Sequence, residues 1–194
     1  MAIVRAQVLS VVLVLLSLTA NAAPIQDLFE QLRDSGLNYE VVGTVCEQVS
    51  RLELQKAYPA SQYEIINGIE YGDATRTIGE LDVVIFEKTT KKAVLVGEVK
   101  CWKDLKSAIA KARDQRLRFQ KSLSKDIALH DYQADYDKSQ FSNVQKYVAI
   151  APKGAKAAGF EMDMENSLSE LMQLRDMLIK CQYQGQCAAP SHDH

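Results

Sequence analysis

Two apolar segments close together in the chain constrain its fold more than any other feature. Residues 77–87 and 92–102 are rich in aliphatic and β-branched side chains, and a Thr-Thr-Lys-Lys stretch separates them. This pattern predicts two adjacent strands joined by a turn. A chain that contains such a buried pair must cover both of its faces, so the sequence predicts a sheet flanked by helices.

The spacing of apolar residues also predicts the remaining helices and strands. Helical spacing of apolar residues predicts helices over residues 24–33, 40–57 and 103–125, and a last one from an N-cap at Asn166 to residue 180. Strands are expected over residues 63–69 and 147–151, with a polar loop over 126–143. With 47% hydrophobic and 25% charged residues, the chain has the composition of a globular protein rather than a disordered one. We therefore expect one α/β domain with the order α-α-β-β-β-α-β-α.

The N-terminus predicts export. Arg5 precedes an apolar run over residues 8–18, and Ala20-Asn21-Ala22 supplies small residues for a signal peptidase. A transmembrane helix needs about 20 apolar residues, so no stable membrane anchor is expected. We expect a periplasmic or secreted protein with a signal peptide (1–22), one domain (23–181) and a C-terminal tail (182–194).

Export bears on the four cysteines. Cys181 and Cys187 are separated by five residues that include Gly185, so an oxidising compartment would allow a disulfide between them. Cys46 and Cys101 are expected to be buried thiols that behave as small apolar groups. Neighbouring strand residues face opposite ways, so Cys101 should point away from the side of Lys100.

Acidic residues interrupt both of the apolar strands. The alternation places Glu80 and Asp82 on one face of the first strand. It places Glu98 and Lys100 on one face of the second. An acid within an apolar strand is costly to bury unless it is paired or binds a cation, and converging carboxylates suit a hard ion such as Mg²⁺. The alternative is a half-exposed hairpin whose polar residues face solvent.

Asp82, fifteen intervening residues and then Glu98-Val99-Lys100 resemble the D-x(n)-(D/E)-x-K signature of the restriction-endonuclease-like, or PD-(D/E)XK, nuclease superfamily. The form is similar to that of Holliday-junction-resolvase-like and RecB-like members. Leu81 stands where the motif's name has Pro. The resemblance implies an αβββαβ core with a mixed four-stranded sheet flanked by helices.

Two further elements fit the same resemblance. Many members carry a glutamate on the helix before the sheet, shortly after a small residue, and Glu47 after Gly43 matches that form; Glu40 and Glu53 are rivals on the same helix. Several members carry a glutamine after the ExK strand with an aromatic residue four positions later. Gln115 and Phe119 match that pattern and lie on one helical face.

The resemblance implies a nuclease that uses Mg²⁺ or Mn²⁺ to hydrolyse DNA. Asp82 and Glu98 would hold the ion with the Val99 carbonyl, helped by Glu47. The metal would polarise the scissile phosphate and activate a water. Lys100 would orient that water or stabilise the transition state.

A basic segment favours a polyanionic partner independently. Residues 103–125 contain five Lys and three Arg against two Asp, a net charge of +6, whereas the whole chain carries −2. Such a stripe is the electrostatic footprint of nucleic-acid binding. The expected contacts to phosphates are Lys103, Lys106, Lys111, Arg113, Gln115, Arg116 and Arg118. The alternative is a solvated helix face.

Two other classes of function remain open from the sequence. One is a non-catalytic module that keeps the fold and binds nucleic acid through the basic helix. The other is a structural envelope protein whose strand acids only face solvent, and it would bind neither Mg²⁺ nor Mn²⁺. A metal-dependent cleavage assay separates both from the nuclease.

Overall fold

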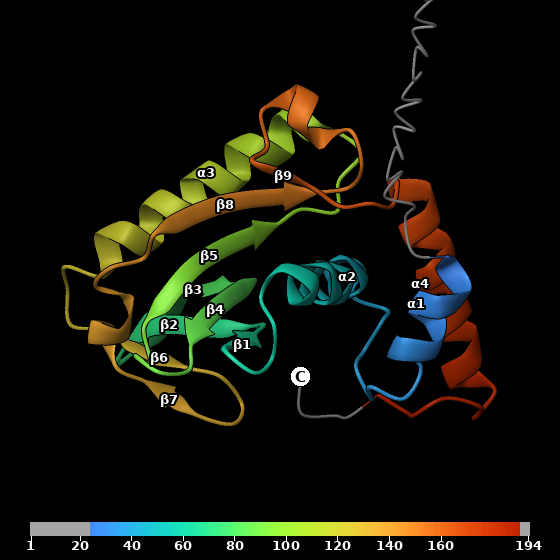
Figure 1. Cartoon of the computed structure of the whole chain (residues 1–194), viewed down its shortest axis with the longest axis horizontal. Helices are drawn as coiled ribbons and strands as arrows, with labels where there is room; N and C mark the ends of the chain where they lie inside the picture. The colour runs from blue at the N-terminus through green and yellow to red at the C-terminus, as the bar shows by residue number, and fades with distance from the viewer. Residues whose placement is uncertain (1–23, 191–194) are drawn as a thin grey trace, which may run out of the picture.

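The computed structural model describes residues 24–190, which form a mixed α/β domain (Figure 1). Its helices are α1 (Ile25–Leu32), α2 (Val42–Ala57), α3 (Leu105–Ser122) and α4 (Leu168–Tyr183), with short 3-10 helices η1 (Lys138–Phe141) and η2 (Ala155–Ala158). Its strands are β1 (Tyr63–Ile66), β2 (Ile69–Asp73), β3 (Arg76–Leu81), β4 (Val83–Glu87), β5 (Ala93–Val99), β6 (Ala128–His130), β7 (Asp135–Tyr136), β8 (Lys146–Ala151) and β9 (Met162–Asp163). The predicted α/β class and all four predicted helices are confirmed.

The strands form two sheets. The larger is mixed and five-stranded in the order β1-β4-β5-β8-β9: β4 is antiparallel to β1 and β5, whereas β8 is parallel to β5 and to β9. The smaller is antiparallel, in the order β3-β2-β6-β7. A mixed sheet was expected with four strands, and the short edge strand β9 makes it five. The second sheet was not predicted.

Alternation along the central strands builds a core on each face of the larger sheet. Val83 and Ile85 pack in one buried cluster with α1, α2 and α4. Val84 and Phe86 face the other way, into a cluster with the smaller sheet and the Phe119 side chain of α3. Figure 1 shows α2 between the sheets and the α1–α4 pair, with α3 running along β8. Burial on both faces explains why these strands read as continuous apolar runs.

The two long strands expected over residues 63–69 and 77–87 are each divided in two, which corrects the prediction. The chain passes from the larger sheet to the smaller at Asn67-Gly68 and returns at Asp82. Gly68 has φ of +75°, a conformation that breaks a strand and favours glycine. Its N–H donates to the Leu81 carbonyl at 3.2 Å, so both crossings occur at the same level. Asp82 therefore lies at the seam between the sheets.

Two smaller expectations are also corrected. The loop expected over residues 126–143 contains β6, β7 and η1, which are too short to show a period. β6 pairs with β2, and β7 pairs with β6. The N-cap of α4 is Ser167 rather than Asn166. The Ser167 hydroxyl accepts from the Glu170 N–H, and the Glu170 carboxylate accepts from the Ser167 N–H, which forms a capping box.

All four cysteines are in disulfides. The predicted Cys181–Cys187 bridge is present, with Cα atoms 5.3 Å apart. Cys46 and Cys101 are also bridged, with Cα atoms 6.0 Å apart, so the expectation of buried thiols is wrong. Helix α2 packs over the end of β5 and brings the two together, a contact that no local pattern reveals. Cys101 shares a buried cluster with Val99, away from the side of Lys100, as the alternation predicted.

The helices between residues 24 and 190 are all too short or too polar to cross a membrane. The signal peptide expected over residues 1–22 lies outside the described residues and stays a prediction.

Candidate active site at the seam of the two sheets

Antiparallel pairing of β4 with β5 brings the predicted acids together. Val83 pairs with Gly97, so the next pair outward in the same register is Asp82 with Glu98. Lys100 follows directly after β5, and its backbone N–H donates to the Ile150 carbonyl of β8 at 2.9 Å. The turn between the strands and their alternation thus place Asp82, Glu98 and Lys100 at one end of the hairpin.

Both acidic side chains contact the lysine. The Lys100 Nζ lies 2.9 Å from Asp82 Oδ2, 3.4 Å from Glu98 Oε2 and 2.9 Å from the Val99 carbonyl oxygen. The Val99 N–H donates to Asp82 Oδ2 at 2.6 Å. The side chains are only 8% (Lys100), 11% (Asp82) and 3% (Glu98) exposed. We call these three residues the acid–lysine cluster.

The acid–lysine cluster contains two carboxyl groups but only one ammonium group. Burial, and then the Asp82 carboxylate, raise the pKa of Glu98 above its ordinary value, which Lys100 and Arg118 only partly offset. Glu98 Oε1 is buried and, among residues 24–190, has no hydrogen-bond partner. A buried oxygen acceptor without a donor, beside a second carboxylate, is suited to an additional cation.

Glu47 is the helix acid that reaches this region. Burial, followed by the carboxylates of Asp82 and Glu80, raises the pKa of Glu47 to about 8. A Cβ at position 43 would lie 2.8 Å from Glu47 Oε1, so Gly43 leaves room for that carboxylate. The rivals point elsewhere: Glu53 accepts from the Glu165 N–H at 3.0 Å, and Glu40 accepts from the Tyr183 hydroxyl.

Two residues at the seam were absent from the predicted site. The Asn67 amide Nδ2 donates to the Asp82 carbonyl at 2.7 Å and to the Glu47 carbonyl at 3.4 Å, so Asn67 connects α2 to the sheet crossing. Its Oδ1 is buried without a partner among the described residues. Burial and the Asp82 carboxylate also raise the pKa of Glu80. The Asn67-Gly68 dipeptide marks a turn in the sequence, but nothing local shows that the turn borders the acids.

The basic helix α3 presents its charges along two edges. Lys111, Gln115 and Arg118 follow each other at helical spacing on one edge. Gln115 Oε1 on this edge is buried and unpartnered within residues 24–190. Arg118 donates to the Ile78 carbonyl of β3 at 3.4 Å, and its positive charge partly opposes the rise in the pKa of Glu98. This edge therefore faces the acid–lysine cluster.

The other edge of α3 is turned toward β8 and η2. Arg113 donates to the Gly159 carbonyl at 3.4 Å. Arg116 donates to the Tyr147 carbonyl at 3.2 Å and pairs with Glu161 at 3.3 Å. The structure thus does not bring these two arginines to the acid–lysine cluster. Lys103 and Lys106 are exposed around the start of α3.

The predicted metal ligands converge, but on an ammonium group. Asp82, Glu98 and the Val99 carbonyl all lie around Lys100 Nζ, which is a set of hard oxygen donors gathered about a cation. Within residues 24–190 no three His, Cys, Asp or Glu side chains are arranged so that they could hold a metal ion. The donor chemistry and the unpartnered Glu98 oxygen fit a divalent ion.

Comparison with known proteins adds no relative to this picture. No protein-family model, no curated protein and no solved structure matches the chain. The function is therefore inferred from the contacts, burial and charge of the residues described above.

Proposed function

We propose that the protein is a metal-dependent nuclease of the PD-(D/E)XK type that hydrolyses phosphodiester bonds in DNA. One observation carries the proposal. Asp82 and Glu98 of the D-x(15)-E-x-K pattern both contact Lys100 in a buried cluster, instead of facing solvent along a hairpin. The alternative from the sequence was a half-exposed hairpin whose polar residues face solvent. Burial of two acids beside one lysine argues against that alternative.

The order of elements around the acid–lysine cluster supports the same proposal. Helix α2 is followed by β1, β4 and β5 of the larger sheet, then by α3 and by β8, which is parallel to β5. Counting only these strands of the larger sheet, the order is compatible with the αβββαβ sequence that the resemblance implies. β2 and β3, which belong to the smaller sheet, are inserted in the chain between β1 and β4.

Asp82, Glu98 and the Val99 carbonyl would hold Mg²⁺ or Mn²⁺, with Glu47 close enough to add negative charge. When bound, such an ion polarises the scissile phosphate and lowers the pKa of an attacking water. Lys100 is held by the same oxygens, so its ammonium group lies where it can orient that water or donate to a phosphate oxygen. Asn67 would keep the Asp82 and Glu47 backbones in place.

The substrate backbone would follow the edge of α3 that faces the cluster. Lys111 and Arg118 would neutralise phosphates there, with Gln115 between them, and Lys103 and Lys106 would extend the field. The second edge is turned toward β8 and η2, and Arg116 is paired there with Glu161, so it would contribute less. Two disulfides are compatible with an oxidising compartment, where an exported nuclease would degrade foreign or environmental DNA.

A digestion assay on residues 23–194 tests this function. Supercoiled plasmid and linear DNA should be cut with Mg²⁺ or Mn²⁺ and left intact with EDTA. Asp82→Asn and Glu98→Gln should each lose about a hundredfold or more in rate. Glu53→Gln is the matched control, because Glu53 is a half-buried acid on α2 that bonds to Glu165 instead.

Each of the other outcomes would support a different function. Salt-sensitive DNA binding without cleavage under any metal would make it the binding module. Absence of both binding and cleavage would favour the structural envelope protein. Cleavage that survives both carboxylate substitutions would place the active site elsewhere.

A further inference from the structure

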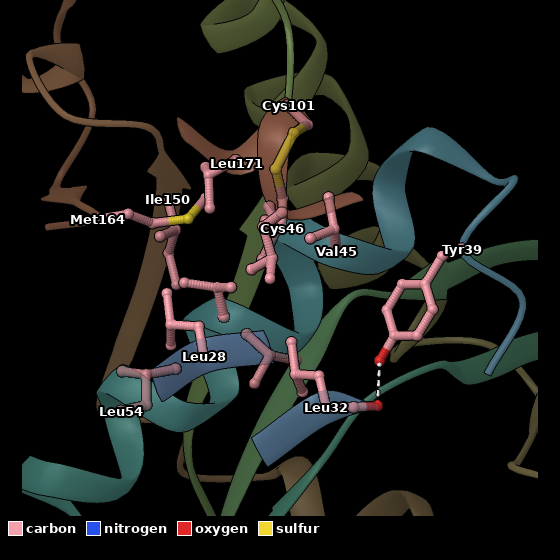
Figure 2. Packing of buried hydrophobic residues seen from close by; sticks show 14 of the residues in the cluster. Leu28, Leu32, Tyr39, Val45, Cys46, Leu54, Cys101, Ile150, Met164 and Leu171 are labelled. Carbon is pink, nitrogen blue, oxygen red and sulfur yellow. Dashed lines mark hydrogen bonds between the residues drawn. A yellow bond between two sulfur atoms is a disulfide. The ribbon is translucent and has the colours of Figure 1, made fainter. Parts of the chain in front are cut away.

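The Cys46–Cys101 disulfide joins the two elements that carry the candidate catalytic groups. Cys46 directly precedes Glu47 on α2, and Cys101 directly follows Lys100 at the end of β5. The bridge spans 55 residues of sequence. Figure 2 shows it beside Val45 in the core beneath α2. A single covalent bond therefore sets how far the Glu47 turn lies from the Lys100 segment.

Few other polar contacts fix this distance. The Asn67 amide reaches the Glu47 carbonyl at 3.4 Å, a long hydrogen bond. Strand β5 has ended at Val99, and residues 100–104 lead into α3 with the Trp102 side chain 44% exposed. Apolar packing of α2 holds the helix against the sheet, but packing tolerates small sliding movements that a covalent bridge prevents.

We propose that the Cys46–Cys101 disulfide is a positioning bond for the active site, so that nuclease activity depends on its oxidation. The inference rests on the proposed function and deepens it. While the bond is reduced, Glu47 and Lys100 are no longer held in register and turnover falls. A newly made chain would then be weakly active in a reducing cytoplasm and become fully active where disulfides form.

The redox step is an ordinary thiol–disulfide exchange. A thiolate of a dithiol reductant attacks Cys101 Sγ, breaks the Cys46–Cys101 bond and forms a mixed disulfide while Cys46 leaves as a thiolate and takes up a proton. The second thiolate of the reductant then displaces Cys101, which is protonated in turn. Two electrons reach the protein and the reductant becomes a disulfide. Formation of the bond reverses these steps, with a protein or low-molecular-weight disulfide as the oxidant. Cys101 is the more accessible sulfur, because it is 9% exposed and Cys46 is fully buried.

The second disulfide provides a matched control. Cys181–Cys187 closes a loop between residues six apart at the end of α4. Arg33 bonds to both sides of Cys187: its guanidinium donates to the Gln186 carbonyl within the loop, and its carbonyl accepts from the Ala188 N–H beyond it. These contacts lie far along the chain from the acid–lysine cluster. Reduction of this bridge should free the tail and leave the site unchanged.

The test compares wild type, Cys181→Ser/Cys187→Ser and Cys46→Ser/Cys101→Ser, each with and without dithiothreitol. Wild type and the tail variant should lose about tenfold or more in kcat on reduction, since small misplacements of catalytic groups cost rates of this order. Their KM for DNA should change less than twofold, because α3 is held by its own packing against β5, β8 and η2. Reoxidation should restore the rate. Cys46→Ser/Cys101→Ser should start at the reduced rate and not respond to dithiothreitol.

Unchanged kcat in wild type, with thiols at 46 and 101 shown by mass spectrometry, would overturn the inference. Because the serine variant could fail to fold, wild-type reduction followed by circular dichroism is the primary measurement. Global unfolding on reduction would also overturn it, since the bond would then be structural only. If oxidised protein cuts no DNA, the proposed function fails. The positioning role of the disulfide is then tested by comparing amide hydrogen exchange in the oxidised and reduced proteins. Faster exchange confined to residues 42–48 and 99–104 would support the positioning role, and unchanged exchange would overturn it.

Discussion

The acid–lysine cluster and helix α3 are both densely charged, yet the protein holds their charges in opposite ways. In the cluster, three side chains at most 11% exposed contact one another within 3.4 Å. On α3 the cations lie on a helix whose buried residues are Ala108, Ile109, Ala112, Phe119 and Ser122, so the charged ends remain near water. Buried charges depend strongly on their partners, whereas exposed ones act nearly independently. Substitutions should therefore have large, coupled effects in the first region and small, additive effects in the second.

The largest effect is expected from Lys100→Met. Without the ammonium group, Asp82 and Glu98 are buried together with no cation, and breaking a buried pair in this way costs about 3–5 kcal/mol of unfolding free energy. Urea denaturation at pH 8 measures the loss. Lys111→Met removes an exposed lysine of α3 and is the control, with a change of less than about 0.5 kcal/mol.

A double substitution sharpens this result. In Asp82→Asn/Lys100→Met the uncompensated charge is reduced, so the double variant should be more stable than Lys100→Met alone. Additive losses would mean that the two groups do not interact in the folded protein. That outcome would remove the distinction between the two regions.

The next effect is a pH dependence that belongs to the cluster and not to α3. The pKa of Glu47 is raised to about 8, and that of Glu98 is raised as well, in both cases chiefly by burial. Between the ordinary carboxyl pKa and about 8, the folded state binds more protons than the unfolded state. Their contribution to stability is thus present at low pH and is lost as pH rises toward 8.

Thermal unfolding of wild type and Glu47→Gln at pH 5 and pH 8.5 measures this contribution. The variant should lose less stability over that interval, by roughly 2–4 °C for each kcal/mol in a domain of this size. Equal changes in both proteins would show that Glu47 titrates normally. Lys106→Gln, which alters an exposed residue of α3, should follow wild type.

The two regions also differ in how far the sequence predicts them. Period-two alternation and a short turn were enough to place Asp82 near Glu98 and Lys100, because an antiparallel hairpin fixes its register locally. The helical spacing of apolar residues likewise predicted α3 and its cations, because that pattern is also local. Both inferences needed only residues close together in the chain.

Contacts between distant elements could not be read from local patterns. The alternation continues through Asp82 although the strand changes sheets there, so the seam was missed. Asn67 enters the site only because both crossings occur at one level. The Cys46–Cys101 bond depends on α2 packing over the end of β5, which neither segment encodes alone.

The smallest effect should separate the two edges of α3. Lys111 and Arg118 lie on the edge where Arg118 acts on the Glu98 carboxyl group. Arg113 and Arg116 lie on the edge turned toward β8 and η2, where Arg116 is paired with Glu161. In the salt dependence of duplex DNA binding, measured with EDTA present, each lost phosphate contact reduces the log–log slope by about 0.9. Lys111→Ala/Arg118→Ala should therefore lower the slope by about 1.8.

The pair Arg113→Ala/Arg116→Ala removes the same charge from the other edge of the helix and is the matched control. It should lower the slope by clearly less, because this edge is turned toward β8 and η2 and the charge of Arg116 is already paired with Glu161. Affinity at one salt concentration would not discriminate, since both pairs remove the same long-range attraction. Equal slopes for the two variants would mean that DNA is bound by the helix as a whole, with no preferred path past the acid–lysine cluster.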